Sequence, residues 1–149
     1  MRESVFSARV YYEDTDASGV VYHANYLRWF ERARTEWLRA LGLGQEALMR
    51  ELGVAFTVAG MEIEFRRPAR LDDVLEVRTT VPLRRRASIV FDQVLHRARD
   101  GEWLARAKVR VGCVGGATFQ PMALPEALRQ AIEAWSSADS AVVWHDRMT

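Results

Sequence analysis

The sequence predicts one α+β domain in which a long helix covers an antiparallel sheet. Its 149 residues are the size of a single domain, and 49% hydrophobic with 28% charged residues is a normal globular balance. Apolar residues recur at helical spacing before residue 42, and from residue 54 they alternate with polar ones. No apolar run approaches the ~20 residues that cross a bilayer, so no membrane span is expected.

The first part of the chain predicts a strand, a loop and two helices. Residues 5–13 are rich in β-prone side chains and predict a strand, and the polar stretch 14–19 predicts a loop. The long helix after this loop is predicted from an apolar stripe, and Gly42 suits its end because glycine accepts a left-handed backbone. That stripe consists of Leu27, Phe30, Ala33, Trp37 and Leu41. A short second helix is expected over 45–52, ended by Gly53.

The second part predicts four strands and a last helix. Alternation marks strands over 61–65, 75–83, 87–95 and 103–113, with an Asp-Gly hairpin turn at 99–102. Pro125 suits the first position of a helix. We expect the domain to span residues 1–136 and residues 137–149 to be a C-terminal tail, where chain mobility commonly concentrates.

Charge and cysteine content exclude several classes of protein. The chain has 21 basic and 20 acidic residues, so it lacks the basic excess of a general nucleic-acid binder. One cysteine, Cys113, cannot form an internal disulfide, and the N-terminus does not resemble a signal peptide. A cytoplasmic location is therefore predicted. One cysteine and three scattered histidines show no zinc spacing, so neither a metal nor a cofactor is expected.

The densest polar cluster, residues 13–19, admits three interpretations. Asp14, Asp16, Ser18 and Gly19 match the opening of a calcium-binding EF-hand loop. Asn25 stands where that loop requires a glutamate, and a strand precedes the cluster in place of a helix, which argues against calcium. A second interpretation is purely structural, because acidic residues and glycine commonly form turns and caps before a helix. Composition alone favours this structural interpretation, with Asn25 as the N-cap.

The third interpretation is a hydrolytic site. A helix N-terminus presents unpaired N–H groups and the positive end of the helix dipole, which stabilise a developing oxyanion. A carboxylate a few residues earlier in the chain can activate water or attack directly.

Residues 10–26, VYYEDTDASGVVYHANY, resemble the signature of the hotdog-fold acyl-CoA thioesterases. More narrowly, they resemble the tol-pal-associated YbgC family, which is related to 4-hydroxybenzoyl-CoA thioesterase. Residues 30–36, 68–73 and 88–91 also fit, so the resemblance covers most of residues 5–125. It implies a hotdog fold, a long central helix wrapped by a five- to six-stranded antiparallel sheet. It also implies homodimers or homotetramers with active sites at the dimer interface.

The resemblance also implies roles for particular residues. Asp16 matches the catalytic aspartate, as general base or nucleophile, and the His23 backbone N–H matches the donor that polarises the thioester carbonyl. The side chains of His23, Tyr22 and Asn25 are expected to support substrate or water. This mechanism needs the His23 amide free, so we expect the helix to begin near residue 21 or 22. That start conflicts with Asn25 as the N-cap.

A coenzyme A substrate needs surface cations for its phosphates. The turn Arg84–Arg86 is a candidate, and Arg85 fits the family pattern best, although a solvated turn is the simpler interpretation of any single arginine. The expected partner is acyl-CoA, with acyl carrier protein as another possible acyl donor. Two rivals stay open: a hotdog hydratase or dehydratase on acyl thioesters, and a non-catalytic acyl-carrier or envelope-system binding module.

Overall fold

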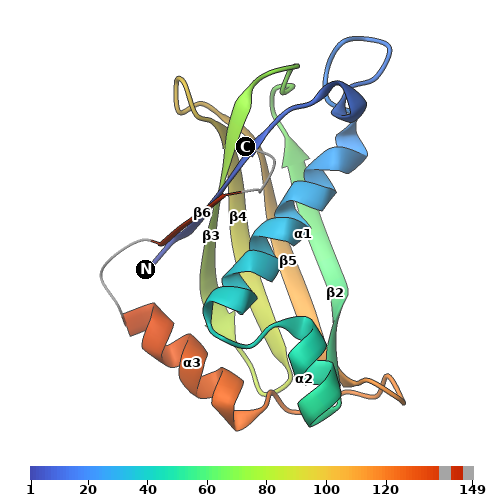
Figure 1. Ribbon diagram of the computed structural model, residues 1–149, viewed down its shortest axis with the longest axis vertical. Helices are drawn as coiled ribbons and strands as arrows, with labels where there is room; N and C mark the ends of the chain where they lie inside the picture. Colours follow the sequence, from blue (N-terminus) through green and yellow to red (C-terminus); the bar gives the residue numbers. More distant parts are fainter. Residues whose placement is uncertain (138–141, 146–149) are drawn as a thin grey trace.

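The computed structural model describes residues 1–137 and 142–145, in which a six-stranded sheet curves around a long helix (Figure 1). The elements, in chain order, are β1 (Ser4–Arg9), the 3-10 turn η1 (Tyr12–Asp14), α1 (His23–Ala40), α2 (Gln45–Leu52), β2 (Val54–Phe65), β3 (Val74–Arg84), β4 (Ser88–Arg97), β5 (Trp103–Gly115), α3 (Glu126–Ser137) and β6 (Val142–His145). The predicted α+β class is confirmed.

The strands lie in the order β2-β5-β4-β3-β1-β6. All neighbours are antiparallel except β1 and β6, which are parallel. Strand β6 falls within the segment 137–149 that the sequence predicts to be a tail, and there it extends the sheet beyond β1. The rest of that segment after Ser137 lies outside the described residues. The sheet therefore has two ends, β2 and β6.

Helix α1 buries one face against the sheet (Figure 1). Trp29, Phe30 and Ala33 are at most 2% exposed, and the ring of Trp37 meets those of Phe91 and Trp135 at 5.2 and 5.7 Å. The predicted stripe is wrong at one position, because Leu27 is 38% exposed and lies outside the core. No helix in the described part of the chain combines the length and apolarity that a bilayer crossing requires.

Two predicted boundaries need correction. The first strand ends at Arg9 and not at residue 13, because the Tyr11 N–H donates to the Asp14 carboxylate at 2.8 Å and closes the η1 turn. Asn25 is not the N-cap, since α1 begins at His23 with Tyr22 in the cap position. The start is one residue beyond the range that the family resemblance implies. Gly42 does follow the helix with a φ of +81°, as predicted.

Candidate active site

The loop formed by residues 15–21 carries Asp16 and leads into α1. Its two sides pair through a bridge between Thr15 and Val21, and the Asp16 N–H donates to the Val20 carbonyl at 2.9 Å. The turn at its tip uses Gly19, whose φ of +81° is a left-handed conformation that suits glycine. The backbone of the loop is therefore a fixed hairpin that holds the Asp16 side chain exposed to solvent.

The Asp16 carboxylate is stabilised as an anion. Its Oδ1 accepts hydrogen bonds from the Ser18 hydroxyl and from the Ser18 N–H, the latter at 2.9 Å. Both bonds favour the charged form, and they hold the pKa of Asp16 below its ordinary value. Asp16 is therefore ionised at neutral pH and can accept a proton or act as a nucleophile.

The N-terminus of α1 opens beside this loop. Among the described residues, no group accepts a hydrogen bond from the backbone N–H of His23 or Ala24. The first N–H of the helix that is bonded within the protein is that of Asn25, which donates to the Tyr22 carbonyl at 2.9 Å. Two free N–H groups and the helix dipole make this end attractive to negative charge. The exposed His23 ring lies 4.5 Å from that of Tyr22 and 6.3 Å from that of Phe65.

Asn25 holds the loop to the helix. This side chain is 5% exposed, and its Nδ2 donates to Asp14 Oδ1 at 2.6 Å. Its Oδ1 accepts from Arg28 Nη1 at 3.1 Å. The Tyr22 N–H donates to the Asp14 carbonyl at 3.0 Å, so Asp14 is tied to α1 by both its side chain and its backbone. Because Asp16 follows Asp14 by two residues, these contacts also help to fix the position of Asp16.

The segment 66–73 supports the other side of the loop. The Val21 N–H donates to the Ala69 carbonyl, and the Ala69 N–H donates to the Tyr26 hydroxyl, both at 2.9 Å. Val20 forms a bridge with Arg70. Burial raises the pKa of Tyr26, so its hydroxyl stays protonated. Sequence reasoning missed Tyr26 and Ala69 because neither the helical stripe nor the polar cluster includes them.

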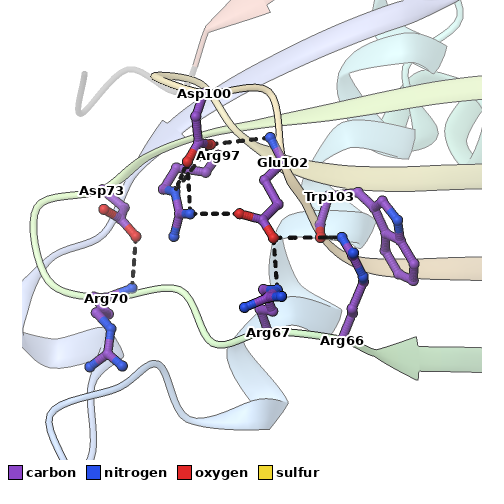
Figure 2. Close-up of polar contacts among 8 residues, drawn as sticks. All are labelled: Arg66, Arg67, Arg70, Asp73, Arg97, Asp100, Glu102 and Trp103. Atoms are coloured by element: carbon purple, nitrogen blue, oxygen red, sulfur yellow. Dashed lines mark hydrogen bonds and ion pairs between the residues drawn. The ribbon is translucent and has the colours of Figure 1, made fainter.

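Segment 66–73 is in turn fastened to the hairpin between β4 and β5 (Figure 2). Glu102 accepts from Arg67 Nε at 2.7 Å and from Arg97 Nη2 at 3.0 Å. The Arg66 guanidinium lies 5.0 Å from the centre of the Trp103 ring. Single surface pairs contribute little, about 0–1 kcal/mol each, but this network has several members that restrain one segment together. Ion pairs and a cation–π contact therefore hold the segment 66–73, which lies behind the loop, against the β4–β5 hairpin.

The predicted site residues do not all lie together. The N-terminus of α1 lies at the end of the sheet where β3 begins (Figure 1). This terminus and the loop before it carry Asp16, Tyr22, His23 and Asn25. Arg85 follows Arg84 at the other end of the 11-residue strand β3, about 33 Å away at ~3.3 Å per residue. Its backbone N–H donates to the Ser88 carbonyl at 2.8 Å within the turn. Within one chain, Arg85 and the loop that carries Asp16 therefore lie toward opposite ends of β3.

The site offers no cluster of metal ligands: in residues 1–137 and 142–145, no group of three or more His, Cys, Asp or Glu side chains could hold an ion. What it offers is an anionic carboxylate on the loop that leads into α1, and backbone donors at the start of that helix that no described residue accepts. That pairing suits attack on a carbonyl group, whose oxygen becomes negative as the attack proceeds.

Comparison with known proteins identifies the family. Residues 10–132 match the thioesterase-like superfamily. The acyl-CoA thioester hydrolase YbgC of Escherichia coli is 50% identical over 120 residues, which are 80% of this chain and 88% of that protein. The chain belongs to the YbgC family of this superfamily. The fold prediction and the predicted family are both confirmed.

Solved structures agree with this assignment. A 1,4-dihydroxy-2-naphthoyl-CoA thioesterase from Synechocystis superposes with a TM-score of 0.84 at 25% identity, covering 91% of this chain and 99% of that one. A 4-hydroxybenzoyl-CoA thioesterase mutant superposes with a TM-score of 0.82, covering 89% and 99%. Because its sequence is only 22% identical, this second structure supports the fold alone, which is the hotdog fold.

Proposed function

We propose that this chain hydrolyses an acyl-CoA thioester to the free acid and coenzyme A, using Asp16 and the N-terminus of α1. The observation that carries the proposal is the ionised Asp16 carboxylate on the short loop that leads into α1, whose first N–H groups, those of His23 and Ala24, find no acceptor among the described residues. Membership of the YbgC family, with relatives named acyl-CoA thioesterases, supports the same activity.

The chemistry follows from this arrangement. The His23 N–H donates to the thioester carbonyl oxygen and, with the helix dipole, stabilises the oxyanion of the tetrahedral intermediate. As general base, Asp16 removes a proton from the attacking water. As nucleophile, it forms an acyl anhydride that water then hydrolyses. In both routes the C–S bond breaks, the CoA thiolate takes up a proton, and the acid is released.

The neighbouring side chains have supporting roles in this proposal. The exposed rings of His23 and Tyr22 are placed to contact substrate or to orient water. Asn25 is buried, so it acts by fixing the loop through Asp14 and not through an open contact with substrate. One buried amide therefore positions the catalytic carboxylate.

The active unit is proposed to be a cytoplasmic homodimer or homotetramer. Strand β2 forms one end of the sheet, and it exposes Val58 and Phe65 at 47% each. An uncovered edge of this kind favours pairing with a second strand. An Arg85 contact to CoA phosphates would have to come from another chain, because within one chain this residue lies at the wrong end of β3.

The Asp16→Asn variant tests the proposal. With a set of acyl-CoA substrates and detection of free thiol, its kcat should fall by roughly 10²–10⁴-fold, the usual contribution of a positioned base. Asp92→Asn is the matched control, because Asp92 is exposed on β4 far from the 15–21 loop, and it should keep wild-type activity. Wild-type turnover in Asp16→Asn would refute the assignment.

The same assay separates the rival functions. A hydratase or dehydratase releases no thiol, and a binding module binds acyl groups without turnover. Replacing acyl-CoA with acyl carrier protein thioesters of the same chain length tests the donor. Higher kcat/KM for the carrier protein would assign it as the acyl donor in place of CoA.

A further inference from the structure

A pocket lies farther along α1 than the candidate active site, between that helix, the start of α2 and strands β2, β4 and β5. Its volume is about 120 Å³, similar to the ~150 Å³ engineered cavity that accepts benzene. Trp37, Phe56 and Phe91 contribute apolar walls, while Glu31, Arg34 and Thr35 contribute polar groups. None of the site residues described above lines it.

Arg34 is the unusual member of this lining. The residue is only 9% exposed, and the charge of Glu31 in the same lining acts on it, but no carboxylate of the described residues is close enough to form an ion pair with it. One bond is made, from Nη1 to Gln93 Oε1 at 2.9 Å, and Gln93 in turn donates to the Phe30 carbonyl and the Thr79 hydroxyl at 3.0 Å each. A guanidinium has five N–H donors, so most of them lack an acceptor.

The unused donors of Arg34 face open space. Among the buried side-chain atoms of the described residues that lack partners, Trp37 Nε1 is present and no Arg34 atom is. The Nε and Nη2 atoms of Arg34 are therefore not sealed in the protein, and the open space that Arg34 borders is the pocket. Burial of the Arg34 charge is costly, the charge of Glu31 offsets this cost only in part, and a ligand acceptor would offset more of it.

Partly buried apolar side chains of β2 lie between the pocket and the candidate active site. Helix α1 packs on β1 and β3, which leaves the inner side of β2 incompletely covered. Phe65 lies beside the His23 ring, and the inner-face residues Ile63 and Met61 that follow toward the pocket are half-buried. An acyl chain that leaves a thioester at His23 can follow these side chains toward Arg34.

We propose that this pocket receives the far end of the acyl group and that Arg34 donates a hydrogen bond to an oxygen carried there. Arg34 follows His23 by eleven residues, about 16 Å at the helical rise of ~1.5 Å. That length matches about 12 carbons, since C–C bonds of about 1.5 Å advance a zigzag chain by roughly 1.3 Å each. The preferred substrates are medium-chain acyl thioesters with a terminal hydroxyl or carboxylate. This inference rests on the proposed thioesterase activity.

The test compares three CoA thioesters of 12 carbons: dodecanoyl, 12-hydroxydodecanoyl and the mono-thioester of dodecanedioic acid. In the wild type, kcat/KM for at least one oxygen-bearing substrate should exceed that of dodecanoyl-CoA by about tenfold or more, as a hydrogen bond to a charged group provides. The better of the two identifies a neutral or an anionic terminus. Arg34→Met should reduce the ratio to about one.

Arg39→Met is the matched control, because Arg39 lies on the same helix with a side chain that is 62% exposed, and it should keep the wild-type ratio. Equal kcat/KM values for all three substrates in the wild type overturn the inference whether or not Arg34→Met folds. A folded Arg34→Met that retains the preference also overturns it. If the wild type hydrolyses none of these or any other acyl-CoA, the proposed function itself fails.

Discussion

Replacing Asn25 with alanine tests how the 15–21 loop is held in place. The change removes the 2.6 Å bond from Asn25 Nδ2 to the Asp14 carboxylate and the 3.1 Å bond from Arg28. A bond to a charged group contributes about 1.5–3 kcal/mol, and the exposed arginine adds a few tenths. The free energy of unfolding should therefore fall by about 2–3 kcal/mol. For a chain of this size that corresponds to a Tm roughly 6–10 °C lower.

Activity should fall together with stability. Asp14 is tied to α1 through Asn25, and Asp16 follows it by two residues, so the loop loses its fixed position relative to the His23 N–H. We expect kcat to decrease more than KM changes, because the loss concerns positioning of the reacting groups. Steady-state kinetics with the best acyl-CoA substrate measure this split.

A double-mutant cycle that combines Asn25→Ala with Asp14→Ala measures the interaction energy between these two residues. Residues in direct contact show interaction energies of about 0.5–3 kcal/mol, and here we expect at least 1. Arg39→Ala is the control on the same helix, because its side chain is 62% exposed and forms only a surface ion pair with Glu36, so the change should matter by less than about 0.5 kcal/mol. A coupling energy near zero together with unchanged kcat would refute the reasoning.

Four further outcomes are expected. In Ser18→Ala, loss of the hydroxyl bond to the Asp16 anion raises the pKa of Asp16, so the acid limb of kcat/KM moves to higher pH. An unmoved limb would contradict the role of the Ser18 hydroxyl. Burial and the nearby Arg78 charge hold the pKa of His96 below its usual 6.5. The unfolded chain therefore takes up a proton before the folded chain does, so the free energy of unfolding should fall as the pH drops below 6.5, and should fall less in His96→Gln. Denaturant titrations at several pH values measure this. Phe30→Ala, at a fully buried position, should cost about 3–5 kcal/mol in chemical denaturation, while the same change at the 69% exposed Phe119 should be nearly neutral. Val58→Lys on the β2 edge should shift the chain toward monomer in sedimentation, and an unchanged distribution would exclude this edge as the interface.

The sequence predicted most of the secondary structure and the family. Helical spacing before Gly42 and alternation after residue 54 each follow one buried face, so helices α1 and α2 and strands β2 to β5 could be located from pattern alone. Boundaries depended on contacts that pattern does not contain. The first strand ends early because the Asp14 side chain closes a turn, and α1 begins at His23 because Tyr22 bonds to the Asp14 backbone.

Periodicity reports which residues are buried, and it cannot report what a buried polar group contacts. The sequence by itself determined that this chain is a hotdog protein of the YbgC family with Asp16 and His23 in its signature motif. Only the tertiary structure decided that Asn25 lies beneath the loop and that Arg85 stands at the opposite end of β3. It also buried Arg34 against Gln93, with no ion pair to any carboxylate in the described part of the chain. These features result from contacts between residues that are far apart in the sequence, and a local sequence pattern does not predict such contacts.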